Sequence, residues 1–237
     1  MNRTMLKTIV SRSFVLLVVL AAAQPGHTAD AKLPYPSMAP IEKYLMNRDA
    51  EIALAQSAAP AAISAKAEVL VLSQKGYETA VKGSNGFVCI VERSWGAGFD
   101  HPEFWNPNIR GPLCFNPPAA RSVRLLYLNR TRMVLAGLSK AQMIDSIKAA
   151  FEKKELPAPE PGSICFMMSK EAYLTDSGSH NLAHLMFEVP RIEGAALGAD
   201  VPNSPIAVGD QADVPEPMTD MIVPVGKWSD GTPAPVD

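Results

Sequence analysis

Three histidines follow residue 30 of this chain, and two of them have a spacing that metal sites use. His180 and His184 stand four residues apart, which on a helix brings two imidazoles to one metal ion. The surrounding sequence disfavours a helix, because residues 177–179 read Ser-Gly-Ser and residues 184–189 alternate like a strand. Four residues of strand would separate the imidazoles by ~13 Å. That distance is too great for one ion, so His180 and His184 are expected to be two histidines at the surface or at a strand end. A metal site of His101, His180 and His184 remains the alternative. No cofactor is predicted.

The same histidines could serve nucleophilic catalysis. Residues 100–103 read Asp-His-Pro-Glu and could supply a base with a carboxylate to orient it, while Ser177 or Ser179 could act as nucleophile to His180. Several catalytic signatures are missing. The chain has no Gly-x-Ser-x-Gly or Ser-x-x-Lys motif of serine enzymes, no His-Glu-x-x-His motif of zinc enzymes and no glycine-rich loop of nucleotide-binding proteins. An exported hydrolase, with or without a metal, is thus the second hypothesis for function.

An aromatic segment between residues 94 and 119 supports the first hypothesis for function, that of a non-enzymatic binding or interaction module. Large rings can form a platform for sugars, ring compounds or apolar peptides, and polar side chains of the same segment can add hydrogen bonds. The alternative interpretation is that the rings form a small core beneath a long loop. The candidate ligand-binding residues are Trp95, Phe99, Phe104, Trp105 and Arg110, with Asn106 as a further hydrogen-bonding group.

Cys89, Cys114 and Cys165 allow one disulfide and one free thiol, in three pairings. None belongs to a Cys-x-x-Cys motif, so that thioredoxin-like and c-type haem chemistry are disfavoured. A Cys89–Cys114 bridge would hold the irregular aromatic segment and stabilise the fold by about 3.5 kcal/mol in the chain-entropy estimate. Cys165 stands in an apolar run, which is typical of a buried, unreactive thiol.

The elements that would position these residues begin with a helix over 41–57, stopped by Pro60. Strands follow at 68–72 and 77–81, and the Asn-Gly pair in 82–86 predicts a hairpin turn into a central strand at 87–91. Residues 94–119 are expected to be one long ordered loop.

The second half combines two helices with further strands. A helix is expected over 121–135, ended by Gly137, and Ser139 opens a capping box for a helix that runs to Lys154. Strands are expected at 164–169, 184–189 and 221–225. The pattern predicts an α+β fold: a single domain with a mainly antiparallel sheet, about three covering helices, long irregular loops and a proline-rich segment at 190–237.

The first 29 residues have the organisation of a signal peptide. A basic start precedes the apolar run FVLLVVLAAA, and small residues at 29–31 place the cleavage between Ala29 and Ala31. The run is about ten residues, half of what a membrane-spanning helix needs, so we expect no membrane span after removal of the signal, and a periplasmic or secreted product of residues 30–237.

Charge and length restrict the kinds of partner. Removal of residues 1–29 takes away three basic residues and no acidic one, so the net charge falls from −2 to −5. An acidic chain without basic clusters is not expected to bind nucleic acid. Roughly 205 residues with 47% apolar content in the whole chain are ample for one domain.

Several stretches resemble a group of predicted exported bacterial proteins without an assigned activity. They read EIALA at 51–55, GYETA at 76–80, NGFVCIVER at 85–93, IRGPLC at 109–114 and GLSK at 137–140. The resemblance implies bacterial export and transfers no catalytic residue, cofactor or partner. Together with the residues above, it leads us to expect an exported, non-enzymatic binding module for a small molecule, glycan or protein, with the hydrolase as the alternative.

Overall fold

An eight-stranded, mostly antiparallel sheet organises the computed structural model, which describes residues 34–178, 182–199, 201–209 and 214–235. The expected signal peptide at 1–29 lies outside this part of the chain. The chain divides into a unit of residues 1–32 and a unit of residues 33–237, and the sheet belongs to the second unit. The strands are β1 (Glu68–Ser73), β2 (Gly76–Val81), β3 (Val88–Glu92), β4 (Gly111–Phe115), β5 (Ile164–Met167), β6 (His184–Pro190), β7 (Ala207–Val208) and β8 (Met218–Pro224).

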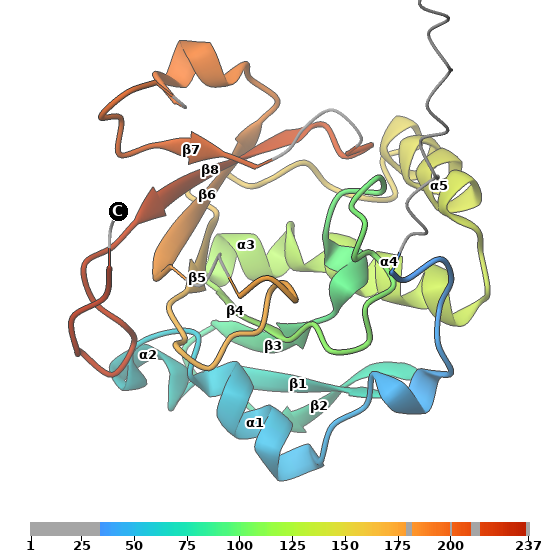
Figure 1. Cartoon of the computed structure of the whole chain (residues 1–237), viewed down its shortest axis with the longest axis horizontal. Helices are drawn as coiled ribbons and strands as arrows, with labels where there is room; N and C mark the ends of the chain where they lie inside the picture. Colours follow the sequence, from blue (N-terminus) through green and yellow to red (C-terminus); the bar gives the residue numbers. More distant parts are fainter. Residues whose placement is uncertain (1–33, 179–181, 200, 210–213, 236–237) are drawn as a thin grey trace, which may run out of the picture. The chain divides into compact units, whose positions relative to one another are not determined.

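The sheet order is β2-β1-β3-β4-β5-β6-β8-β7, and β1 and β3 form its parallel pair. Helices cover both faces of the β1–β3–β4 region: α1 and α2 lie on one side, and α3 and α4 on the other (Figure 1). The fold is therefore α+β, as predicted. The helices are α1 (Arg48–Gln56), α2 (Ala61–Ser64), α3 (Pro117–Arg121), α4 (Arg124–Leu135) and α5 (Lys140–Glu152), with 3₁₀ turns η1 (Ile41–Lys43), η2 (Ser94–Gly96) and η3 (Gly194–Leu197). No helix among the described residues is long and apolar enough to cross a membrane.

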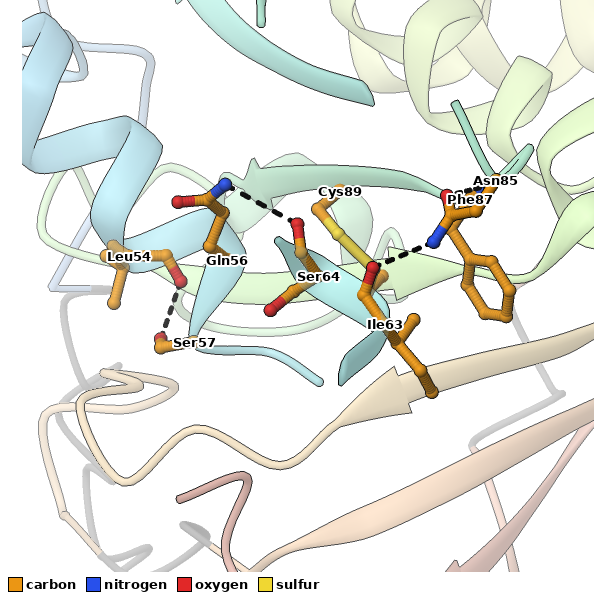
Figure 2. Close-up of a disulfide and its surroundings, with 9 residues drawn as sticks. Leu54, Gln56, Ser57, Ile63, Ser64, Asn85, Phe87 and Cys89 are labelled. Atoms are coloured by element: carbon orange, nitrogen blue, oxygen red, sulfur yellow. Dashed lines mark hydrogen bonds between the residues drawn. A yellow bond between two sulfur atoms is a disulfide. The ribbon is translucent and has the colours of Figure 1, made fainter. Parts of the chain in front are cut away.

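The predicted Cys89–Cys114 disulfide is present, and it joins directly paired positions of β3 and β4. Its side chains lie on the face covered by α1 and α2, within a cluster that includes Ala55 and Val91. Figure 2 shows the disulfide among its surroundings, where Asn85 donates to the carbonyl of Ile63 in α2. The third cysteine, Cys165, is fully buried as a free thiol on the opposite face.

Two expectations about local structure were wrong. The helix expected over 41–57 is divided, because Tyr44 turns into the core after η1 and Asn47 then caps α1 by accepting from the amides of Asp49 and Ala50. The strand at 77–81 does not form a hairpin with 87–91. It pairs instead with β1, which is buried on both faces and takes β3 as its other neighbour.

Residues 94–119 were expected to form one long loop, but they contain a strand and the start of a helix. Residues 111–115 form β4, a fully buried strand between β3 and β5, although Gly111 and Pro112 are poor strand formers. Helix α4 begins at Arg124, after the separate short helix α3. The capping box at Ser139 and the helix end at Gly137, which has φ +75°, are confirmed.

Curvature of the sheet has the largest consequence for function. Glu92 of β3 and Asp220 of β8 are four strands apart, which in a flat sheet would be about 19 Å. Both nevertheless line one cavity and interact electrostatically. The sheet therefore curls around the side covered by α4, and the strand ends near the 94–110 segment are brought together there.

Candidate functional site

A cavity of about 390 Å³ lies where the curled sheet, α4 and the 94–110 segment meet, and we call it the Glu92 cavity. This volume is within the range of small-molecule sites. Its polar lining residues are Glu92, Ser94, His101, Glu103, His184 and Asp220, beside the ion-paired Arg93. Its apolar walls include Ile109, Tyr127, Met167, Leu174, Met186 and Ile222.

The Glu92 carboxyl enters this cavity through a space left by two glycines. A Cβ atom at Gly96 would lie 2.2 Å from Glu92 Oε2, and one at Gly111 would lie 2.5 Å from Oε1. Neither glycine has a positive φ, so the requirement is space rather than backbone conformation. Among the described residues no hydrogen-bond donor contacts this carboxyl. Burial raises its pKa to about 8, with a further increase from Asp220 and an opposing effect of Arg130.

His184 contributes an imidazole of fixed orientation. Its Nδ1 lies 2.7 Å from the carbonyl oxygen of Leu182. Because a carbonyl only accepts, Nδ1 carries the proton and Nε2 keeps its lone pair. Burial lowers the pKa of His184, although the Leu182 carbonyl opposes this. At neutral pH the cavity therefore combines a protonated carboxyl with a neutral imidazole, a pairing suited to acid–base chemistry.

Acidic groups continue from the cavity along the sheet. Glu188 pairs with Asp220 across β6 and β8, so both side chains are on the same face. Glu188 is 3% exposed, and among the described residues its carboxyl oxygens make no hydrogen bond of ordinary geometry, although the side chains of Asp220 and Cys165 lie beside them. Burial, and then the charge of Asp220, raise the pKa of Glu188 well above its usual range. The free thiol of Cys165 lies in the same environment, where burial and Glu188 raise its pKa and make it a poor nucleophile.

The arginines near the cavity are already paired. Arg93 donates to Glu51 at 2.8 Å and also to the carbonyls of Tyr44 and Val91. Arg130 forms a two-pronged contact with Glu216 through Nε at 2.7 Å and Nη2 at 2.8 Å. Its Nη1 donates to three successive carbonyls, those of residues 95–97, and so fixes the turn that carries Gly96. Both arginines therefore stabilise the cavity walls, and their charges are already paired with carboxylates of the protein.

The aromatic candidates do not form an exposed platform. Trp95, Phe99, Phe104 and Trp105 are at most 8% exposed and pack with Tyr44 in one cluster. Their polar groups are used internally: Trp95 donates to Thr131, and the carbonyl of Trp105 accepts from Tyr44. The structure thus places these rings in a core beneath the loop, which was the alternative interpretation of the sequence.

The two polar candidates of the aromatic segment, Asn106 and Arg110, also use their hydrogen bonds within the protein. Arg110 donates to the carbonyls of Pro107 and Ile109, and burial lowers its pKa to about 10. Asn106 is fully buried and donates to Glu103 and Asp176. Only Ile109, His101 and Glu103 of residues 98–110 reach the Glu92 cavity.

The histidine candidates are partly brought together. His101 and His184 line the same cavity, whereas His180 lies outside the described residues. Within the described part of the chain, no group of three His, Cys, Asp or Glu side chains is placed to hold a metal ion. His101 is exposed at the mouth, and its Nδ1 accepts from the amide of Glu103.

No family model matches this chain. Searches of curated proteins and of solved structures likewise return no match. The function must therefore be argued from the cavity.

Most of the cavity residues were not singled out from the sequence, among them Glu92, Ser94, Tyr127 and Asp220. A signal for the first was available, because Glu92 continues the alternation of Val88 and Ile90 and so faces the same side of the sheet. Ser94 is 2% exposed and its hydroxyl has no hydrogen-bond partner among the described residues, which only the structure reveals.

Proposed function

We propose that this chain is an exported protein that binds a small organic molecule in the Glu92 cavity. The observation that carries the proposal is the Glu92 carboxyl, which is held between Gly96 and Gly111, receives no hydrogen bond from the described residues and opens into a mainly apolar cavity of about 390 Å³. Glu92 is only partly buried and its carboxyl faces the cavity, so a ligand there can supply the hydrogen-bond donor that the described residues do not. The signal-like residues 1–29 and the disulfide support export, since disulfides persist outside the reducing cytoplasm.

The walls favour a small molecule over a glycan or a protein. Sugars bind on exposed aromatic faces, and the rings of the 94–110 segment are buried. The Glu92 cavity instead offers aliphatic and methionine side chains, with a few polar groups at one end. That combination is the usual one for compact organic ligands.

Native mass spectrometry of the protein purified from a bacterial periplasm tests the proposal, together with a thermal-shift screen of small organic molecules. We expect a retained adduct or a stabilising compound, and loss of either in Ala97→Leu, which narrows the cavity. Ala195→Leu is the matched control, because Ala195 is exposed in η3. If no compound binds, or if both variants bind equally, this cavity is not the site.

A second function is favoured by one specific observation: His101 and His184 share the cavity with Glu92 and the unpartnered hydroxyl of Ser94. In an exported hydrolase, the Nε2 atom of His184 would act as the base and protonated Glu92 as the acid. Hydrolysis of p-nitrophenyl acetate and butyrate tests this alternative. We expect turnover that is lost in His184→Asn and in Glu92→Gln; turnover no faster than buffer, or unchanged in both variants, would exclude this chemistry for such esters.

A further inference from the structure

Resting on the proposed function, we infer that the molecule bound in the Glu92 cavity is an organic cation, with its ammonium group at Glu92 and Asp220 and its apolar body against Tyr127 and Met186. Acidic groups outnumber the basic groups free to pair with them in this cavity, whose walls are mainly apolar. For such a ligand, the cavity supplies negatively charged groups for the ammonium group and apolar side chains for the rest of the molecule.

The imbalance appears when each charged group around the cavity is assigned its partner. Arg93 is neutralised by Glu51, and Arg130 by Glu216. Glu103 accepts from Asn106, Thr175 and the amide of Asp176. Glu92 and Asp220 remain without an ion-pair partner among the described residues, and no lysine is found in the described lining.

A second observation is independent of the lining. Glu188, opposite Asp220 on the neighbouring strand, is more than nine-tenths buried, and no cationic side chain among the described residues is paired with it. Three carboxyl groups therefore lie on one face of the curled sheet, and none of them forms an ion pair within the described part of the chain. A buried ammonium group would be stabilised by this environment, while a carboxylate or phosphate would be repelled by it.

The apolar walls indicate an organic cation rather than a simple ion. Tyr127 lies beside the Glu92 carboxyl: its Cε1 atom and Glu92 Oε2 both lie within 3.4 Å of the point that a Cβ atom would occupy at Gly96. Its ring can therefore pack against the carbons next to the ammonium group. Met167 and Met186 supply adaptable thioether surfaces that suit a ring or a short alkyl chain.

Binding of a cation should release a proton. The groups that face Glu92 are Arg130 and Tyr127 from α4, Asp220 from β8, His184 from β6, and Arg93, His101 and Glu103 from the segment that follows β3. With a pKa of about 8, roughly 1% of Glu92 is ionised at pH 6 and about half at pH 8. Because an ammonium group selects the ionised form, its apparent affinity should rise about 50-fold over this interval.

Matched sets of probes test the charge of the ligand directly. Each set keeps one apolar body and changes the head group: 2-phenylethylamine, 2-phenylethanol and 3-phenylpropionate form one set, and hexylamine, hexanol and heptanoate the other. Isothermal titration of the exported, purified protein should give at least tenfold tighter binding of an amine than of its alcohol, with proton release into the buffer. Glu92→Gln should abolish this preference and the pH dependence, whereas Glu152→Gln, on the exposed face of α5, should retain both.

The outcomes separate the two proposals. If alcohols or carboxylates bind as tightly as the amines, the cavity binds ligands but the inference about charge is wrong. If no member of either set binds and no adduct is retained from the periplasm, the proposed function itself fails. A preference for amines that survives Glu92→Gln would overturn the assignment of the ammonium site to Glu92.

Discussion

Replacement of Gly111 by alanine tests whether the space for the Glu92 carboxyl is as tight as the structure indicates. The new Cβ atom would lie 2.5 Å from Oε1 and 2.6 Å from Cγ of Glu92. Side-chain carbons do not approach that closely, so either Glu92 or β4 must shift. Overpacking of this kind costs about 1–3 kcal/mol of folding free energy.

A double-mutant cycle attributes this cost to Glu92. Gly111 has no positive φ, so alanine is compatible with its backbone, and in a Glu92→Ala background the substitution should stabilise the protein by about 0.4–1 kcal/mol. The coupling energy between the two positions is then about 1.5–4 kcal/mol, obtained by adding that gain to the overpacking cost.

Urea denaturation of the four proteins measures the coupling. Gly98→Ala is the matched control, since its Cβ would approach only Asp100 Oδ1, at 3.3 Å, and its cost should not depend on Glu92. Additive effects of Gly111→Ala and Glu92→Ala, within about 0.5 kcal/mol, would refute the reasoning and show that the carboxyl is not confined.

Three further predictions concern the buried groups. Glu51→Ala should cost about 3–5 kcal/mol in chemical denaturation, because it leaves Arg93 buried without its carboxylate, whereas exposed Glu152→Ala should stay within about 0.5 kcal/mol. Trp105→Ala should cost about 3–5 kcal/mol by the same assay, and a near-neutral result would revive a ligand-binding role for this ring. Because the pKa of Glu92 is raised from 4.5 to about 8, the folded state holds a proton that the unfolded state has lost between these values, and stability should fall as pH rises through this interval. The urea midpoint at pH 5 and pH 8 should therefore differ less in Glu92→Gln than in the parent, and equal differences would argue against the raised pKa.

Local patterns predicted much of the fold. Alternating and apolar runs identified β1, β3, β5 and β6, and the Ser139 capping box identified the start of α5. These features depend on a few neighbouring residues, so one sequence suffices to recognise them. Strand pairing depends on tertiary burial instead, which is why β2 was given the wrong neighbour.

The site could be predicted only in part. His101 and His184 were recognised by residue type, and the structure brings them to one cavity. The aromatic residues were recognised by composition, which does not distinguish a platform from a core. Glu92 and Asp220 lie 128 positions apart in the sequence, and only the curvature of a sheet, which no local pattern encodes, brings them together.

The order in which the walls are supplied has a consequence for synthesis. Residues 92–186 provide most of the cavity, but Asp220 and Ile222 come from β8, which pairs with β6 along its whole length. A polypeptide made or translocated from its amino end would therefore lack this part of the cavity wall until residue 224 has emerged. Until then the exposed edge of β6 is available for incorrect strand pairing, so ligand capture and protection of that edge should both begin when β8 docks.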